Sequence, residues 1–185
     1  MTESVHQQPR VAGRLADYAA PLAGLGAAAS LAAAFAFQHL GGFEPCQLCV
    51  WQRWPHVAGV LFGAAALASE GRGARLGSAA GAVVMTVGAG LALYHAGVEQ
   101  GWWAGLEGCS GGSVEGLSTE ALIARIEAGP TARCDEIPWS FAGLSMAAWN
   151  AILSAGLASL FAFGAASGAT GRWSVLHDDA RRPSA

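Results

Sequence analysis

The chain contains no lysine and few charged residues of any kind. Only 12% of its 185 residues are charged, whereas 53% are hydrophobic, and the mean hydropathy is +0.37. These values point away from a soluble domain and toward an integral membrane protein. The ten arginines are scattered and the net charge is −3, so no basic patch supports a nucleic-acid-binding function.

Four segments are candidates for crossing a membrane, because a transmembrane helix needs about 20 mostly apolar residues. They are residues 18–40, the stretch between Arg53 and Glu70, residues 76–98, and a core near 144–163. The second is short unless it extends back toward Cys49, whereas the others contain no Asp, Glu or Arg. We therefore predict an all-α membrane protein built as a four-transmembrane-helix bundle.

The placement of arginines predicts the orientation, since positive residues near the ends of spans are retained in the cytoplasm. Seven of them fall on one side of the predicted bundle: Arg10, Arg14, Arg72, Arg75, Arg172, Arg181 and Arg182. The opposite side holds three arginines, eight acidic residues and five interfacial tryptophans. Both termini are therefore expected in the cytoplasm and all four cysteines on the outer side.

The predicted organisation is a single membrane domain, residues 18–171, between cytoplasmic tails at 1–17 and 172–185. Two outer loops belong to this domain, a short one at about 41–53 and a long one at about 99–138. The first apolar segment is not expected to be a cleavable signal peptide, because polar or mixed residues precede it and three further apolar segments follow it.

The long second loop contains a predicted short helix over residues 117–127. Ser118 or Thr119 can cap its start, and the Gly-Pro sequence at 129–130 ends it. Its apolar face consists of Leu122, Ile123 and Ile126. Such a face predicts either a helix lying flat on the membrane or one packed against the top of the bundle.

Four cysteines form two candidate redox pairs on the predicted outer side. Cys46 and Cys49 make a C-x-x-C sequence in the short loop, and Cys109 and Cys134 lie in the long loop. A C-x-x-C pair can lower the pKa of one thiol from about 8.5 to roughly 3.5–7.5, which yields the thiolate needed for disulfide exchange. If Cys49 lies near a helix N-terminus, the helix dipole and the nearby Arg53 favour its thiolate.

Two structural readings of the cysteines stay open beside the redox one. The first pair could form a static disulfide that ties the short loop, or it could be half of a zinc site. A zinc site wants four closely grouped ligands, whereas Cys109 and Cys134 are 25 residues apart and form no second C-x-x-C sequence. We therefore expect no bound metal.

Arg53 and His95 are candidate cofactor-binding residues near the same membrane surface. A charge next to an apolar helix costs about 2.5 to 3.5 kcal/mol when placed deep in the bilayer, so Arg53 invites a functional explanation. It could stabilise negative charge developing on an electron acceptor, or simply extend toward the headgroups. His95, at the outer end of the third span, could donate a proton or be a solvated interface residue. Helix packing is the preferred account of His39, His56, Trp149 and Asn150.

Three sequence motifs together resemble a known family. They are P-C-Q-L-C-V-W-Q-R at residues 45–53, Y-H-A-G-V-E at residues 94–99, and R-C-D-E-I-P-W-S-F-A-G-L-S-M-A-A-W-N at residues 133–150. The combination resembles the bacterial disulfide bond formation protein B (DsbB) family over roughly residues 18–163. The resemblance implies a four-helix thiol:quinone oxidoreductase of the inner membrane, with periplasmic cysteine loops.

In that family the enzyme reoxidises DsbA, a soluble periplasmic thioredoxin-like oxidase, and passes the electrons to ubiquinone or menaquinone. By position, the resemblance implies that Cys109 is attacked by the reduced partner and that Cys134 exchanges with Cys46. Cys49 would then face the quinone, with Arg53 and His95 around the ring. A strongly oxidising partner, at about −120 mV for DsbA, is hard to reoxidise with ordinary thiols, which makes a quinone a suitable final acceptor.

Three other functions are weighed against this one. A related quinone-linked oxidase could serve a dedicated partner, which the sequence separates poorly from a general one. An enzyme of the vitamin K epoxide reductase type normally carries the other cysteine pair in its first loop, whereas the C-x-x-C comes first here. A membrane scaffold with two inert disulfides would keep all four cysteines oxidised and insensitive to quinone.

Overall fold

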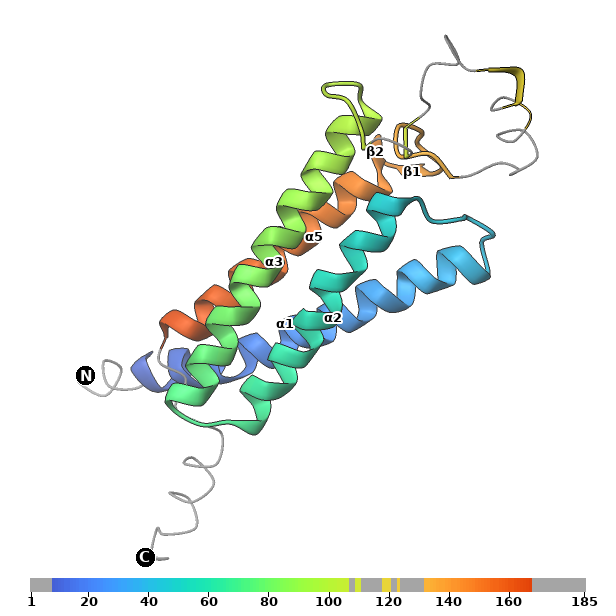
Figure 1. The fold of residues 1–185 in the computed structure, drawn as a ribbon. Helices are drawn as coiled ribbons and strands as arrows, with labels where there is room; N and C mark the ends of the chain where they lie inside the picture. Colours follow the sequence, from blue (N-terminus) through green and yellow to red (C-terminus); the bar gives the residue numbers. More distant parts are fainter. Residues whose placement is uncertain (1–7, 107–108, 111–117, 121–122, 124–131, 168–185) are drawn as a thin grey trace, which may run out of the picture.

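The computed structural model describes residues 8–106, 109–110, 118–120, 123 and 132–167. Within them, four long helices follow one another in alternating directions: α1 (Gln8–His39), α2 (Gln47–Ala68), α3 (Arg72–Glu99) and α5 (Met146–Ala166). Figure 1 shows the tight α2–α3 turn at the same end of the bundle as the start of α1 and the end of α5. The α1–α2 connection and the segment leading into α5 lie at the opposite end.

Three of these helices are long and apolar enough to cross a membrane, namely Ala16–His39, Arg72–Glu99 and Met146–Ala166. They confirm the prediction of a helical membrane protein. Helix α2 has 22 residues but is not among the three. Its N-terminal half carries the polar residues Gln52, Arg53 and His56, which agrees with the short apolar run expected there. A fourth crossing by α2 stays a prediction.

The bundle buries small residues and exposes large apolar ones. Alanines and glycines dominate the interior, whereas Leu25, Leu61 and Val83 are each about two-thirds exposed, at 67%, 65% and 64%. Helices in lipid associate through close backbone approach, because burying apolar surface gives no driving force between them. An outer surface of leucine and valine around an alanine and glycine interior is therefore the pattern expected in a bilayer.

Glycines set the closest helix contacts. A Cβ atom at Gly63 of α2 would lie 2.7 Å from the Cα of Gly24 in α1, so only glycine fits at this crossing. On α3, the ring of the fully buried Phe161 lies directly against Gly81. These contacts bring α2 and α5 against their neighbours.

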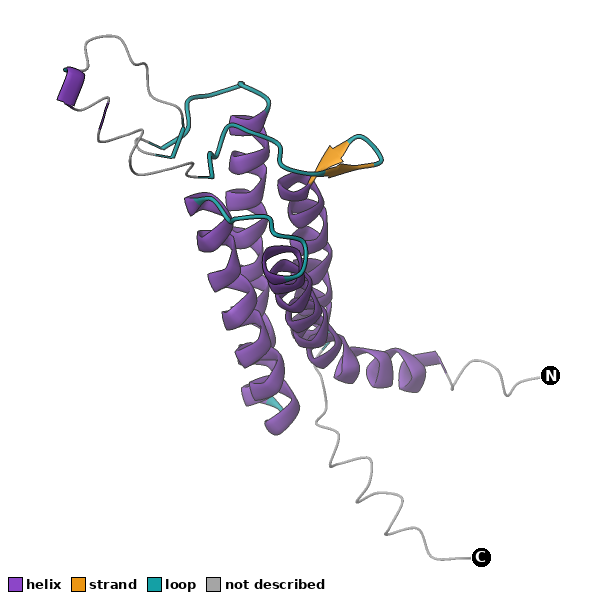
Figure 2. Cartoon of the chain, turned by 90° about the vertical axis from the view of Figure 1, so that its right-hand side faces the viewer, coloured by secondary structure: helices purple, strands orange, loops and turns teal. Residues whose placement is uncertain are grey.

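A two-stranded hairpin precedes α5 and was not expected from the sequence. Strands β1 (Ser140–Phe141) and β2 (Leu144–Ser145) pair antiparallel across a two-residue turn. Both turn residues have positive φ, 50° at Ala142 and 78° at Gly143, as the type I′ turn of a tight hairpin requires. Figure 2 shows the hairpin at the start of α5, where Ser145 caps the helix by accepting from the Ala148 N–H.

Two element boundaries differ from the predicted ones. Helix α2 begins at Gln47, inside the segment predicted as the loop 41–53, because the Cys46 side chain caps it. Helix α1 begins at Gln8, inside the predicted tail 1–17. Within the predicted helix 117–127, Thr119, Glu120 and Ile123 are helical and Ser118 is not, and the other residues of that segment lie outside the described residues, as do 1–7 and 168–185.

Candidate functional site

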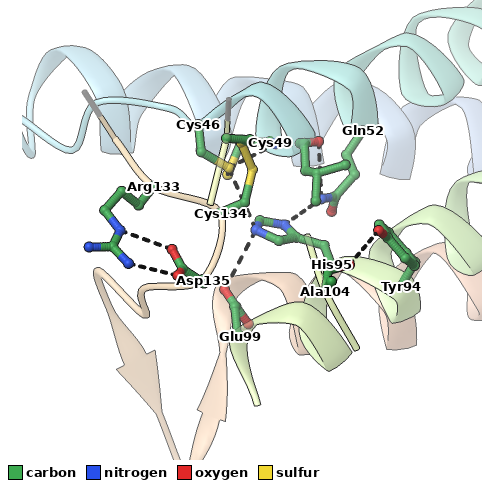
Figure 3. Close-up of a disulfide and its surroundings, with 12 residues drawn as sticks. Cys46, Cys49, Gln52, Tyr94, His95, Glu99, Ala104, Arg133, Cys134 and Asp135 are labelled. Atoms are coloured by element: carbon green, nitrogen blue, oxygen red, sulfur yellow. Dashed lines mark hydrogen bonds and ion pairs between the residues drawn. A yellow bond between two sulfur atoms is a disulfide. The ribbon is translucent and has the colours of Figure 1, made fainter. Parts of the chain in front are cut away.

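All four cysteines gather at the end of the bundle that carries the hairpin. Cys109 and Cys134 form a disulfide, and Cys46 and Cys49 are free thiols whose sulfur atoms are 3.0 Å apart. The Sγ atoms of Cys46 and Cys134 and a ring nitrogen of His95 all lie within 4.8 Å of one another (Figure 3). The two predicted pairs thus form one sulfur cluster, buried except for the half-buried Cys49, although Cys109 and Cys46 are 63 positions apart in the sequence.

Local backbone contacts hold each pair in place. Cys46 is the N-cap residue of α2, and Cys49 lies in the first turn of that helix, three residues later. The N–H of Cys134 donates to the carbonyl of Cys109 at 2.7 Å, and the N–H of Cys109 donates to the carbonyl of Leu106 at 3.0 Å. Cys134 is completely buried, so the disulfide of the long loop lies against the bundle.

Hydrogen-bond donors converge on the sulfur of Cys46. It shares a hydrogen bond with the thiol of Cys49 at 3.0 Å, accepts from the Cys49 N–H at 3.3 Å, and lies 3.5 Å from Nε2 of His95. The hydrogen bond from the Cys49 thiol, followed by those from His95 and the Cys49 backbone, lowers the pKa of Cys46 to about 4 despite its burial. Sequence reasoning placed the favoured thiolate on Cys49, but the capping position belongs to Cys46, which therefore receives the free N–H of the helix end.

His95 lies inside the bundle rather than at a solvated helix end. It is 3% exposed, and its Nδ1 atom is 2.8 Å from Nε2 of Gln52. Its Nε2 atom lies 4.0 Å from a carboxylate oxygen of Glu99, whose side chain is only 2% exposed. The other oxygen of Glu99 accepts a short hydrogen bond from the hydroxyl of Ser145. The imidazole thus connects the sulfur cluster to a buried carboxyl group.

A chain of uncharged polar side chains continues from His95 across the bundle. Oε1 of Gln52 accepts from Nδ2 of Asn150 at 2.6 Å, and the hydroxyl of Ser154 donates to Oδ1 of Asn150 at 3.3 Å. Sequence reasoning passed over Gln52 and assigned Asn150 to helix packing. The signal for both was available, because polar groups inside apolar helices are costly unless they pair with one another.

A cavity of about 590 Å³ opens beside the sulfur cluster. Cys49, Arg53 and His95 contribute to its lining, and aromatic residues including Phe37, Trp139 and Trp149 form much of the rest. Cavities of this size and character, mostly apolar with a few polar groups, typically bind small organic ligands. The cavity could therefore accept a flat apolar ring next to the Cys46 and Cys49 pair.

Arg53 lies in the lining of this cavity and against α1. Its guanidinium carbon is 4.8 Å from the ring centroid of Phe35, a cation–π contact. Among the described residues, no carboxylate forms an ion pair with Arg53, whereas Arg133 binds Asp135 and Glu136. Its N–H donors thus remain available to an acceptor in the cavity.

In the part of the chain that the structure describes, neither His39 and His56 nor the donor set for a metal suggests a second site. His39 stacks on Phe35 with ring centroids 6.2 Å apart. His56 lies against the Gln52 carbonyl at 3.0 Å, and its Nε2 atom has no partner among the described residues. Cys46, His95 and Cys134 are close enough to hold a soft metal ion, but the sulfur of Cys134 is already bonded to Cys109. The arrangement therefore suits disulfide exchange better than metal binding.

Comparisons with known proteins point in one direction. The profile of the family described as "Disulfide bond formation protein DsbB" matches residues 16–164. Curated proteins named "Disulfide bond formation protein B" are similar to the chain. The one from Methylococcus capsulatus is 34% identical over 139 residues, covering 70% of this chain and 82% of its own length. The one from Nitrosococcus oceani is 30% identical over 148 residues, covering 77% and 88%. No solved structure matches the chain significantly.

Proposed function

Because the chain belongs to the disulfide bond formation protein DsbB family, a family of disulfide-forming membrane oxidoreductases, we propose that it is a thiol:quinone oxidoreductase. It reoxidises a periplasmic thioredoxin-fold dithiol oxidase of the DsbA type and passes the electrons to a membrane quinone, ubiquinone or menaquinone. The observation that carries this proposal is the approach of Cys46 and Cys134, whose sulfur atoms lie within 4.8 Å of each other. Electrons can pass between the two pairs only if these sulfurs meet.

The first half of the reaction takes electrons from the partner. A thiolate of the reduced partner attacks Cys109, forms a mixed disulfide and releases the thiolate of Cys134. The partner's second thiol then attacks its own sulfur in that mixed disulfide and releases Cys109. The partner leaves as a disulfide, and two electrons remain on Cys109 and Cys134.

The second half moves those electrons to the membrane pair. Cys134 attacks Cys46 of the Cys46–Cys49 disulfide and releases Cys49, and Cys109 then attacks Cys134 and releases Cys46. This exchange leaves a Cys109–Cys134 disulfide and two free thiols at 46 and 49, which is the pattern of sulfur bonds in the structure. The Cys49 N–H, the Cys49 thiol and the His95 imidazole, all in contact with the Cys46 sulfur, would make it a good leaving group in the last step.

The cavity suits a quinone as the final acceptor. Its apolar and aromatic walls fit a hydrophobic ring, and Cys49 and Arg53 both line it. When bound, a quinone supplies an acceptor for two electrons and two protons. Arg53 would hold the ring and stabilise negative charge on its oxygens, and Cys49 would present its sulfur to it. His95, at the wall of the same cavity, holds a proton between Cys46 and Glu99.

The proposed setting is the bacterial inner membrane, with both termini in the cytoplasm and both cysteine pairs on the periplasmic side. The distribution of arginines supports this orientation. An oxidising periplasm also suits a protein whose four cysteines meet in one cluster.

The test is anaerobic turnover of the purified protein with a reduced DsbA-type oxidase and a soluble quinone. Wild type should reduce quinone to quinol while the partner becomes oxidised, one quinone for each disulfide formed. Cys49→Ser and Cys109→Ser should each abolish turnover, because each removes one of the two pairs. If the thiols never change during incubation with several thioredoxin-fold donors, and no quinol forms, the protein is a scaffold with inert disulfides and the proposal fails.

A further inference from the structure

The amide of Gln52 lies at the centre of the hydrogen-bond chain that joins α2, α3 and α5. Its Nε2 atom is 3.2 Å from the Leu48 carbonyl and 2.8 Å from Nδ1 of His95. Its Oε1 atom accepts from Asn150 at 2.6 Å. Figure 3 shows the imidazole of His95 between Gln52 on one side and the sulfur of Cys46 on the other. Gln52 is 5% exposed, so its amide is largely shielded from bulk solvent.

The Leu48 carbonyl fixes which end of the amide faces His95. A backbone carbonyl can only accept, so the Gln52 atom beside it must be the NH₂ group. The same NH₂ group donates to Nδ1 of His95, and Nδ1 must therefore accept. A neutral imidazole that accepts at Nδ1 carries its proton on Nε2. The hydrogen-bond pattern thus selects one of the two tautomers.

The selected proton points at the membrane-proximal thiol pair. Nε2 of His95 is 3.5 Å from the sulfur of Cys46, a suitable distance for an N–H group donating to sulfur. We propose that Gln52 is a positioning residue, which holds the His95 proton on Nε2 so that the imidazole donates to the Cys46 thiolate. The inference rests on the proposed thiol chemistry of Cys46 and deepens it. Gln52 touches neither sulfur in any recorded hydrogen bond and acts through His95.

The stabilised thiolate has a redox consequence. Reduction of the Cys46–Cys49 disulfide by two glutathione molecules moves two electrons to the sulfurs and yields glutathione disulfide, a Cys46 thiolate, a Cys49 thiol and one proton. A donor aimed at the thiolate stabilises the reduced products and makes the disulfide a stronger oxidant. Gln52 therefore helps this pair to accept electrons from Cys134.

Other ionisable groups lie near Cys46 and His95, and their charges also affect the titration of Cys46. Cys49, Glu99 and Cys134 lie next to Cys46 or His95. The charged or titratable residues elsewhere in the cavity lining are Glu44, Arg53, His56, Arg133 and Glu136. Helices α1 and α5 contribute none to that lining. Because Gln52 is uncharged, replacing it with leucine leaves all these charges in place.

The test compares three variants in a chain whose only cysteine is Cys46, obtained by changing the other three to serine. Gln52→Leu removes the amide, Gln52→Glu keeps its shape but presents only acceptors, and Ser78→Ala is the control. Ser78 donates to its own helix at Ala74, away from the cluster. Nitrogen-15 NMR of labelled histidine reads which ring nitrogen of His95 carries the proton, with His95→Gln identifying the signal. The ultraviolet absorbance of the thiolate reads the titration of Cys46.

In the parent chain with Cys46 alone, and in its Ser78→Ala variant, we expect the His95 proton on Nε2. In Gln52→Glu we expect it on Nδ1, where it faces the carboxylate introduced by the substitution. Gln52→Leu should raise the apparent pKa of Cys46 by about one unit, because a hydrogen bond to a charged acceptor is worth at least that much. A wild-type proton on Nδ1, or a Cys46 titration that is the same in Gln52→Leu and Ser78→Ala, would overturn the inference. Should Gln52→Leu fail to fold, the tautomer in Gln52→Glu still decides the question.

A second readout uses the native membrane pair, with Cys109 and Cys134 changed to serine. In a glutathione buffer, Gln52→Leu should lower the equilibrium constant for reducing the Cys46–Cys49 disulfide about tenfold, equivalent to about 30 mV. An unchanged constant would contradict the redox role of Gln52. Neither experiment needs quinone or a partner protein. A correct tautomer without any quinone turnover would refute the proposed function and leave the role of Gln52 standing.

Discussion

At the scale of single residues, one sulfur atom combines two structural roles. Cys46 caps α2 through its side chain. Its sulfur also forms a hydrogen bond with the Cys49 thiol and lies next to the imidazole of His95. A helix N-terminus with further donors is a site for negative charge. Of the two thiols in the C-x-x-C sequence, we therefore expect the one outside the helix to be the thiolate when the pair is reduced.

The pH dependence of the reduced pair tests this assignment. The pKa of Cys46 is lowered to about 4, so its thiolate should be present at neutral pH and disappear only as the pH falls through about 4. The thiolate absorbance of the reduced protein, titrated without quinone, measures this. Cys46→Ser should remove the low-pH transition, whereas Cys49→Ser should retain it because a serine hydroxyl can still donate. Loss of the transition in Cys49→Ser alone would assign the thiolate to Cys49.

Arg53 tests the proposed acceptor site. Arg53→Gln removes a charge from the cavity lining and should raise the KM for quinone about tenfold, since a hydrogen bond from a charged group contributes about 1.5 to 3 kcal/mol. Oxidation of the partner in a single turnover, measured without quinone, should stay at the wild-type rate. Arg75→Gln is the control, because Arg75 contacts the Ala165 carbonyl between α3 and α5 instead. Equal effects of both substitutions would argue against a role for Arg53 in quinone binding.

At the scale of elements, glycine contacts decide how closely the helices approach. Gly63 packs on the backbone of Gly24, whereas Gly90 of α3 has nothing within 4 Å of its Cβ position. Both are helical glycines, for which alanine is intrinsically better by about 1 kcal/mol. Any difference in stability between alanine at position 63 and alanine at position 90 therefore comes from packing.

Matched alanine substitutions measure this packing. Gly63→Ala places a methyl group against backbone that cannot rotate away, so it should lower the thermal stability of the detergent-solubilised protein. Gly90→Ala should leave the stability unchanged or raise it slightly. Circular dichroism during heating reads both. If Gly63→Ala were as stable as Gly90→Ala, the close α1–α2 crossing would be wrong.

At the scale of the whole molecule, the bundle brings together loops that are far apart in sequence. Cys134 reaches Cys46 because the ends of α2, α3 and α5 meet at the same end of the bundle (Figure 1). The chain with Cys49→Ser and Cys109→Ser keeps only these two cysteines. It should form an internal Cys46–Cys134 disulfide on mild oxidation, detected by mass spectrometry of peptides. The matched variant with Cys49→Ser and Cys134→Ser should form its Cys46–Cys109 disulfide more slowly, and the reverse order would contradict the proposed relay.

Sidedness is also a property of the whole molecule. Single cysteines placed at Ser69, in the α2–α3 turn, and at Ser140, in the hairpin, probe the two ends of the bundle in an otherwise cysteine-free chain. A membrane-impermeant thiol reagent added to intact cells should label position 140 and should label position 69 only after the inner membrane is opened. Labelling of position 69 in intact cells would reverse the proposed orientation.

Sequence patterns alone were enough to identify the class of protein and its family. Low charge and long apolar runs predicted membrane helices, because hydrocarbon excludes charge over a length that composition alone reveals. The C-x-x-C pair and its flanking motifs predicted the family, because those local sequences carry the reactive groups. They could not reveal the hairpin at Ser140–Ser145, whose turn places the non-glycine residue Ala142 at positive φ and lacks the usual Asn-Gly or Asp-Gly signal.

The contacts among the site residues, by contrast, follow from how the helices pack. His95 became buried and Gln52 became its partner because α2 and α3 pack side by side, a relation that spacing along the chain does not encode. The donors on Cys46 come from its own helix end and from α3, so the thiolate could not be assigned from the C-x-x-C sequence alone. Neighbouring residues in the sequence reveal which reactive groups are present. The tautomer of His95, its burial and the contacts of the Cys46 sulfur depend on atoms that come together only when the bundle forms.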